Sequence, residues 1–172
     1  MKILSDILLR KKVLKVLSIS FITGLAFGQL HWENIPFQNA NANLADVAMK
    51  RVTRDQEFVK NIKENVSIHE VNAKTLPFNY QFSENLPYDV RYLNHCGFGG
   101  EDALYLILQG DKGNISVFLT NVTSEEISST NRGNKTTFTM PIEDSSIILV
   151  GETGENLNAV ADKLKNIINP IS

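Results

Sequence analysis

The sequence predicts an α+β domain that follows a membrane-directing segment. Three observations support this prediction: an uncharged run at residues 16–30 follows a basic cluster, apolar strand-like runs fill the middle of the chain, and an amphipathic helix pattern lies near the C-terminus. We expect an N-terminal membrane helix, then two helices, an antiparallel sheet of about five strands, and a C-terminal helix packed on the sheet. Such an order is typical of a two-layer α+β sandwich.

The N-terminal run reads VLSISFITGLAFGQL and contains no charged side chain. It is shorter than the roughly 20 residues of a comfortable membrane span, but the apolar residues before Lys15 extend it, because a lysine can reach the lipid headgroups. Positive charge stands only on its leading side, which is typical of a cytoplasmic N-terminus. We therefore expect a basic cytoplasmic tail at 1–15 and a transmembrane signal anchor at 16–32, in a single pass of the bacterial inner membrane.

Two other interpretations of this run stay open. Ala26-Phe27-Gly28 resembles a signal-peptide cleavage site, and cleavage there would release a soluble secreted protein. Alternatively, the run is a buried helix of a soluble protein, which leaves the one-sided charge unexplained. The signal anchor and the cleaved signal peptide both place the body in the periplasm. They differ in whether residues 16–30 keep it tethered to inner-membrane lipid.

The charge of the body excludes one class of partner. The formal charge of the chain is −2 and the first 28 residues carry +4, so the rest carries −6. Nucleic-acid binding needs clustered positive charge, and we expect no nucleic-acid partner. The single cysteine excludes an intramolecular disulfide and a four-cysteine metal site.

A linker is predicted at 33–43, where Pro36 and several asparagines stand without periodicity. The periplasmic domain should then occupy 44–172. Its first helix is expected from about Asn43, because apolar residues recur at helical spacing as far as Ile62. The opposite side of this helix is heavily charged, which indicates a solvated face or, alternatively, a partner-docking surface.

A second, short helix is predicted by local chemistry. Ser67 and Glu70 have the spacing of a capping box. Pro77 should end the segment, because a proline disfavours helical backbone at the residue before it. Residues 78–87 are interpreted as a loop.

Strand predictions follow from apolar runs. The run ALYLILQ is apolar throughout, which is typical of a strand covered on both faces. Gly110-Asp111-Lys112-Gly113 is predicted to be a hairpin turn, whereas the polar stretch 121–134 is interpreted as a long loop. The five predicted strands are Tyr88–Asn94, Ala103–Gln109, Asn114–Thr120, Lys135–Met140 and Ser146–Val150.

The final helix has the clearest periodicity. Apolar residues from Leu157 to Ile168 recur at intervals of three and four. Pro170 follows the pattern and should mark its end. This apolar stripe is expected to pack on the sheet.

No pattern in the sequence predicts catalysis. It contains no His-x-x-x-His pair, no Gly-x-Ser-x-Gly elbow and no phosphate-binding glycine loop. We therefore expect no enzyme activity, no catalytic residues, no cofactor and no metal.

The most unusual stretch is Asn94–Gly100, NHCGFGG. Adjacent His95 and Cys96 could lower a thiol pKa or supply two ligands to a metal. Gly99 and Gly100 could let a ligand approach the backbone closely. These four residues are our candidate binding residues, and the simpler interpretation is a glycine-rich turn or bulge with a small buried thiol.

Two stretches, YLNHCGFGGEDALYLILQGDKGNISV and FTMPIEDSSIILVGE, resemble a proteobacterial family of uncharacterised membrane proteins known as a domain of unknown function. The family pattern is a Cys-x-x-x-Gly turn, a strand ending in Gln-Gly, and Gly-x-Val-Thr-Val. It corresponds to Cys96 and Gly100, Gln109-Gly110, and Gly113–Val117. The similarity covers roughly residues 40–168 and implies one membrane helix followed by a small periplasmic domain without known enzyme activity.

Members of this family are commonly suggested to be anti-sigma-factor-like regulators. Two departures weaken that transfer: only about 15 residues precede the membrane segment, and Tyr105 stands where the family has histidine. We expect a membrane-anchored periplasmic interaction or sensory module without catalysis, whose partner is an unidentified envelope or regulatory protein; sigma-factor-type regulation is a narrower hypothesis. The alternatives are a thiol- or metal-dependent protein acting through Cys96 and His95, and a secreted binding protein.

Overall fold

The computed structural model describes residues 40–76, 78 and 80–171. The predicted basic tail, the membrane segment at 16–32 and most of the predicted linker lie outside these residues. No helix within the described ranges is long and apolar enough to cross a bilayer. The elements in chain order are α2 (Ala40–Val59), α3 (Ile68–Ala73), β1 (Tyr80–Phe82), β2 (Val90–Phe98), β3 (Glu101–Gln109), β4 (Asn114–Thr120), β5 (Ser128–Arg132), β6 (Lys135–Ile142), β7 (Ser145–Glu152), α4 (Leu157–Ile167) and β8 (Ile168–Pro170).

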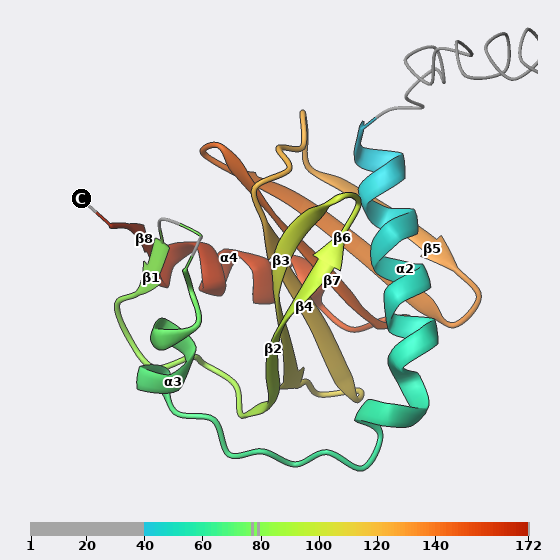
Figure 1. Ribbon diagram of the computed structural model, residues 1–172. Helices are drawn as coiled ribbons and strands as arrows, with labels where there is room; N and C mark the ends of the chain where they lie inside the picture. Colours follow the sequence, from blue (N-terminus) through green and yellow to red (C-terminus); the bar gives the residue numbers. More distant parts are fainter. Residues whose placement is uncertain (1–39, 77, 79, 172) are drawn as a thin grey trace, which may run out of the picture. The chain divides into compact units, whose positions relative to one another are not determined.

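The main sheet is antiparallel and has six strands in the order β2-β3-β4-β7-β6-β5 (Figure 1). The α+β class is confirmed, but the expected number of about five strands is too low. β5 lies inside the predicted loop 121–134, and β1 pairs with β8 in a separate two-stranded sheet. These strands escaped prediction because β5 is a mostly exposed polar edge strand, and β1 and β8 have three residues each.

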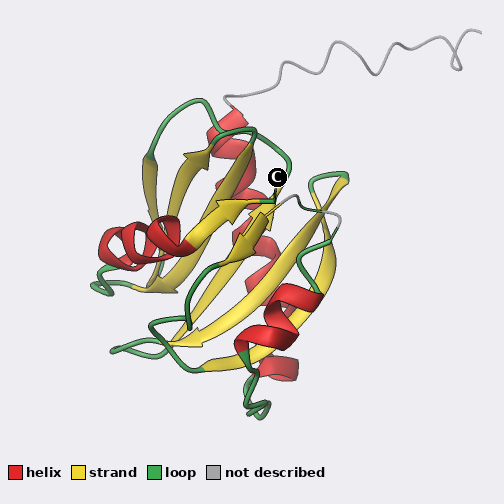
Figure 2. Cartoon of the chain, turned by 90° about the vertical axis from the view of Figure 1, so that its left-hand side faces the viewer, coloured by secondary structure: helices red, strands yellow, loops and turns green. Residues whose placement is uncertain are grey.

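Helices cover both faces of the main sheet, so the two-layer prediction is wrong. Figure 2 shows helices on either side of the strands, with α2 on one face and α4 on the other. The sequence did contain the reason, because Ala103–Leu108 of β3 is buried without interruption. A strand with both faces buried requires a layer on each side.

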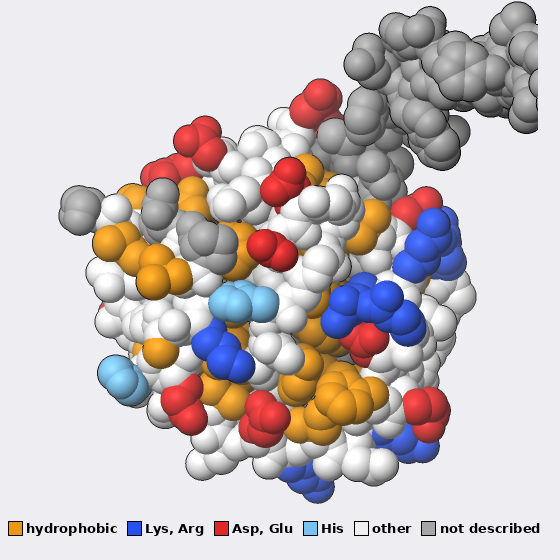
Figure 3. Space-filling model, viewed as in Figure 1, with side chains coloured by type: hydrophobic (Ala, Val, Ile, Leu, Met, Phe, Trp, Pro, Cys, Tyr) orange, Lys and Arg blue, Asp and Glu red, His pale blue; other side chains and the backbone are white. Residues whose placement is uncertain are grey.

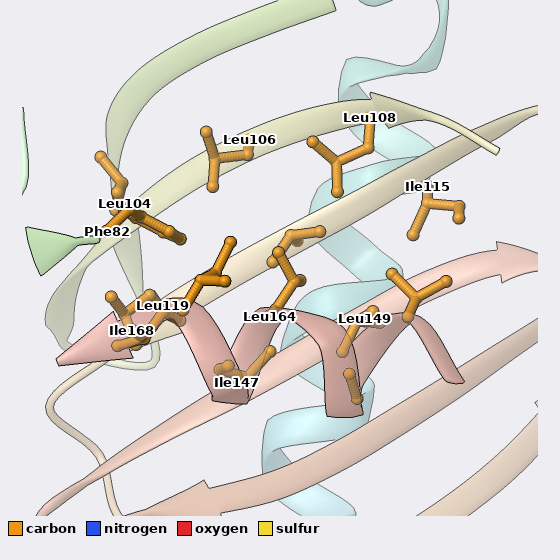
Figure 4. Close-up of a cluster of buried hydrophobic side chains, with 14 of the residues drawn as sticks. Phe82, Leu104, Leu106, Leu108, Ile115, Leu119, Ile147, Leu149, Leu164 and Ile168 are labelled. Carbon is orange, nitrogen blue, oxygen red and sulfur yellow. The ribbon is translucent and has the colours of Figure 1, made fainter. Parts of the chain in front are cut away.

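The face beneath α4 has an aliphatic core. Figure 4 shows side chains from β3, β4 and β7 gathered around Leu164 of α4. Leu164 is 1% exposed, and its neighbours alternate along their strands with residues that point to the other face. The labelled side chains of this cluster are Phe82, Leu104, Leu106, Leu108, Ile115, Leu119, Ile147, Leu149, Leu164 and Ile168.

Helix ends agree with the sequence where a side chain caps them. Ser67 caps α3, and the reciprocal hydrogen bonds with Glu70 form the predicted capping box. Glu70 accepts hydrogen bonds from the Ser67 backbone and hydroxyl, and these lower the pKa of its carboxyl group. By contrast, α2 begins at Ala40, before the expected start at Asn43, and α4 ends at Ile167 because the next residues form β8.

The predicted hairpin turn joins β3 to β4. The backbone N–H of Gly110 donates to the Gly113 carbonyl at 2.8 Å. A Cβ on Gly110 would lie 2.6 Å from the Ile115 side chain, so this close approach requires glycine. The turn fixes the register that places Tyr105 beside Phe118.

Candidate functional site

The structure places His95 and Cys96 inside β2, and their side chains leave opposite sides of the strand. Cys96 is 7% exposed and packs in the cluster beneath α2. His95 is exposed on the other side, where its Nε2 lies 2.6 Å from the Lys74 carbonyl oxygen and its ring lies 6.3 Å from that of Phe78. Successive strand residues point to opposite faces, so this geometry does not support a joint thiol or metal site of the two side chains.

The local environment of Cys96 favours the protonated thiol. Burial raises its pKa, and the nearby Arg51 guanidinium opposes that shift without reversing it. Reactive cysteines instead have a lowered pKa and an accessible sulfur. In the described part of the chain, no cluster of three or more His, Cys, Asp and Glu groups could hold a metal ion.

Gly99 and Gly100 form the turn between β2 and β3. Their φ values are +65° and +100°, a region that side chains disfavour. A Cβ on Gly99 would come no nearer than 4.0 Å to Val47 of α2, so conformation rather than space explains this glycine. The role of this turn as a ligand-binding backbone stays a prediction.

The face beneath α2 carries a row of aromatic rings. Tyr105 stacks on Phe118 with centroids 4.5 Å apart, and Phe98 contacts Phe118 at 5.0 Å. Tyr92 meets Tyr105 edge-on at 5.5 Å, and Phe58 of α2 meets Tyr92 edge-on at 5.9 Å. The row therefore links the interior of the sheet to an exposed aromatic residue, since Phe58 is 62% exposed.

A charged pair on α2 lies over this row. Arg51 donates to the Asp55 carboxylate, and the side chains are 22% and 15% exposed. The Arg51 guanidinium carbon lies 6.0 Å from the centre of the Tyr105 ring, at the outer limit of a cation–π contact. The pair adds a partly buried charge to the side of α2 that packs on the sheet, whereas the buried residues of α4 are all apolar.

Tyr105 also provides a buried hydroxyl. It is 1% exposed, and its hydroxyl lies 3.2 Å from the Ser116 Oγ in the neighbouring strand. Burial raises the pKa of Tyr105 to about 12, while the Ser116 hydrogen bond lowers it in part. The phenol is therefore protonated at neutral pH and can donate a hydrogen bond.

A cavity of about 230 Å³ opens between the C-terminal half of α2 and the sheet. Ser116 lines it, and the Lys135–Glu152 ion pair closes one side with a distance of 2.7 Å between Nζ and Oε1. The lining residues are Val52, Gln56, Val59, Lys60, Ile107, Asn114, Ser116, Lys135 and Glu152. Sequence reasoning missed this site, although the hydroxyls of Tyr105 and Ser116 inside apolar runs were a signal of it.

Two further hydroxyls on this face have no hydrogen-bond partner among the described residues. Thr137 and Thr139 of β6 are each 1% exposed, and neither Oγ1 has a partner in the structure. Their opposite residues in β7, Val150 and Ile148, belong to the cluster beneath α2. The α2 face thus contains buried polar groups among its apolar side chains, and each of these hydroxyls needs a physical explanation.

Comparison with protein families now identifies the chain at the family level. A family model described as a protein of unknown function, DUF3379, matches residues 10–168. The chain belongs to the DUF3379 family. The match confirms the resemblance to a family of unknown function, and it includes β2, the aromatic row and every residue of the cavity. No curated protein and no solved structure matches this DUF3379 protein.

Proposed function

We propose that this DUF3379 protein is a non-catalytic interaction or sensory module, anchored in the bacterial inner membrane by residues 16–30 with its domain in the periplasm. The uncharged run and the positive charge on its leading side support the anchor. The proposed partner is an envelope or regulatory protein. Sigma-factor-type envelope regulation is the narrower form of the proposal, and the −6 charge of the body argues against nucleic acid.

One observation carries the proposal. The helix that follows the proposed anchor along the chain, α2, covers the face of the sheet that holds the aromatic row and the cavity. A molecule bound at this face contacts α2 itself. Because α2 continues toward the anchor in sequence, movement of α2 would pass a binding event to the membrane.

The surface beside α2 has the character of a protein interface. Phe58 exposes 62% of its area and leans on Tyr92, while Arg54 exposes most of its side chain nearby on the same helix. Figure 3 shows hydrophobic side chains gathered beside the lower half of α2, with acidic and basic side chains around them. Aromatic residues and arginine are enriched in protein interfaces.

A reporter fusion tests the anchor. Alkaline phosphatase, which is active only after export, is fused to the C-terminus, and the full chain should give an active reporter in the membrane fraction. Deletion of residues 16–30 should leave the reporter inactive and soluble. An inactive reporter on the full chain would contradict the proposal. A mature N-terminus near Gly28 by mass spectrometry would replace the anchor with a secreted protein.

Site-specific photo-crosslinking tests the interaction surface. A photoreactive residue at position 58 should crosslink to a defined envelope or regulatory protein in intact membranes. Position 127 is the matched control, because Ile127 is 60% exposed and belongs to the segment before β5 rather than to α2. Equal crosslinking at both positions, or none at position 58, would count against a partner at this surface. A recovered regulator of a sigma factor would support the narrower form.

A further inference from the structure

We propose that the cavity beneath α2 binds a small amphipathic monocarboxylate, with its carboxylate at Ser116 and Lys60 and its alkyl chain against Val52, Val59 and Ile107. This inference deepens the proposed sensory function by naming the class of ligand. It depends on that function only for its biological purpose, because binding itself requires no membrane and no partner protein.

The first argument is a count of hydroxyl hydrogens. Tyr105 and Ser116 are 1% and 5% exposed, and the two hydroxyls share one hydrogen bond. Each hydroxyl carries one hydrogen, so a single mutual bond uses only one of the two. When Tyr105 donates to Ser116, the Ser116 hydrogen is left for an acceptor in the cavity that Ser116 lines. A buried donor without an acceptor costs stability, and a ligand oxygen would supply the acceptor.

The second argument is charge. The cavity is lined by two lysines and one glutamate, and Glu152 already pairs with Lys135. Among residues 40–76, 78 and 80–171, Lys60 has no carboxylate within ion-pair distance. The lining therefore has one uncompensated positive charge, which fits a ligand with a single negative charge.

The third argument is shape. Val52, Val59 and Ile107 give the cavity an apolar wall, while Asn114, Ser116 and Lys60 supply polar groups. Its volume of about 230 Å³ is below the range of about 300 to 1,000 Å³ for drug-sized ligands. A short alkyl chain with one carboxylate matches both properties. When Tyr105 is the donor to Ser116, a purely apolar ligand would leave the Ser116 hydrogen unpaired. An ammonium ligand would be repelled by the positive charge of Lys60.

Matched probes test this inference with the full chain in detergent. Hexanoate should bind and raise the melting temperature, whereas hexanol and hexylamine, which share its alkyl chain, should not. Calorimetric titration gives the affinities. Equal binding of hexanoate and hexanol would overturn the proposal, because the carboxylate would then contribute nothing. No binding of hexanoate would overturn it as well.

Variants locate the binding site. Ser116→Ala and Lys60→Gln should each weaken hexanoate binding about tenfold, the usual effect of losing a hydrogen bond to a charged group. Lys63→Gln is the matched control, since Lys63 is exposed close by and does not line the cavity. Lys60 is also exposed, so its variant stays informative should Ser116→Ala fail to fold. Unchanged binding in Lys60→Gln would contradict the assignment.

The outcomes separate this inference from the proposed function. If the protein binds hexanoate but the phosphatase reporter is inactive, the proposed ligand site is supported and the proposed membrane anchor is contradicted. If the reporter is active but hexanoate does not bind, the proposed anchor is supported and the proposed class of ligand is contradicted.

Discussion

The two faces of the main sheet use the same strands and differ in chemistry. Beneath α4 most side chains are aliphatic, with a few aromatic rings such as Phe82 and Phe138, and they form one cluster that includes Leu164. Beneath α2 an apolar cluster also contains a row of aromatic rings, and a charged pair and a cavity lie beside it. Two buried hydroxyls on this face have no hydrogen-bond partner among the described residues. Alternation along each strand separates the two sets of residues. One face can therefore hold the fold together while the other is free to carry function.

The difference also has an energetic meaning. Apolar burial contributes roughly 25 cal/mol for each Å² removed from water. The α4 face, which has the larger apolar cluster, should therefore contribute more to the free energy of unfolding than the α2 face. An unsatisfied buried hydroxyl costs about 1 to 3 kcal/mol, and the α2 face has at least two. We expect α2 to separate from the sheet at a lower free energy than α4 does.

The largest expected effect is on the α4 face. Leu164→Ala should lower the free energy of unfolding by about 3 kcal/mol, because it opens a cavity in a close-packed cluster. Leu44→Ala is the matched change on α2, since Leu44 is 3% exposed, and it should cost about 2 kcal/mol. Urea unfolding of both variants measures the difference. A larger loss in Leu44→Ala would reverse the comparison.

The next effect depends on pH and belongs to the α2 face. The pKa of Tyr105 is about 12 in the folded protein and 10.0 in its reference state. Between these values the unfolded chain loses the proton and the folded protein keeps it, so stability falls as pH rises through this window. In Tyr105→Phe, the loss of unfolding free energy over this pH range should be smaller by about 2 kcal/mol.

The measurement compares unfolding free energies at about pH 9 and about pH 11.5 in the wild type and the variant. Other tyrosines and lysines titrate in both proteins, so only the difference between the two pH slopes is informative. Tyr92→Phe serves as the control for removal of a hydroxyl on the same face. Identical slopes in the wild type and Tyr105→Phe would show that burial does not hold the proton on Tyr105.

A stabilising change should be available beneath α2. Thr139→Val replaces an unpaired buried hydroxyl with a methyl group of similar size and should raise the free energy of unfolding by about 1 kcal/mol. Thr136→Val is the control, because the Thr136 hydroxyl donates to Asn131 at 2.6 Å and its loss should give no gain. Melting temperatures of the two variants distinguish these outcomes. Destabilisation by Thr139→Val would mean that its hydroxyl is satisfied in solution.

The smallest effect concerns the ion pair between α2 and β5. Arg132 and Asp46 lie 2.7 Å apart, but their side chains are 57% and 47% exposed. Asp46→Asn should therefore change the free energy of unfolding by less than about 0.5 kcal/mol. Asp55→Asn should cost more, because Asp55 is 15% exposed. A large effect at Asp46 would show that this surface pair, rather than packing, holds α2 on the sheet.

Local signals in the sequence predicted much of the fold. The capping box at Ser67, the hairpin turn at Gly110 and the stripe of α4 each depend on residues close together in the chain. By contrast, β5 has no burial pattern to read, because it is an edge strand whose side chains are mostly exposed. β8 needs β1 as its partner, and that pairing joins Phe82 to Ile168 across the chain.

The candidate site depended on contacts that sequence spacing does not determine. Asn94–Gly100 was conspicuous in composition, but strand alternation separates His95 from Cys96. The cavity instead needs Ile107 opposite Ser116 and Lys135 opposite Glu152, which are set by strand register. The hydroxyls within ALYLILQ and NISVFLT were visible in the sequence. Their meeting on one face became evident only once the β3–β4 pairing was known.

The pairing of β1 with β8 also affects the timing of folding. A ribosome releases the chain from its N-terminal end, so Tyr80–Phe82 is synthesised long before its partner Ile168–Pro170. Until Leu157–Ile167 has been made, the aliphatic face lacks α4 and stays open to water or to a chaperone. Closure of this face therefore waits for synthesis of α4, and truncation before Leu157 should yield a product that proteases clear quickly.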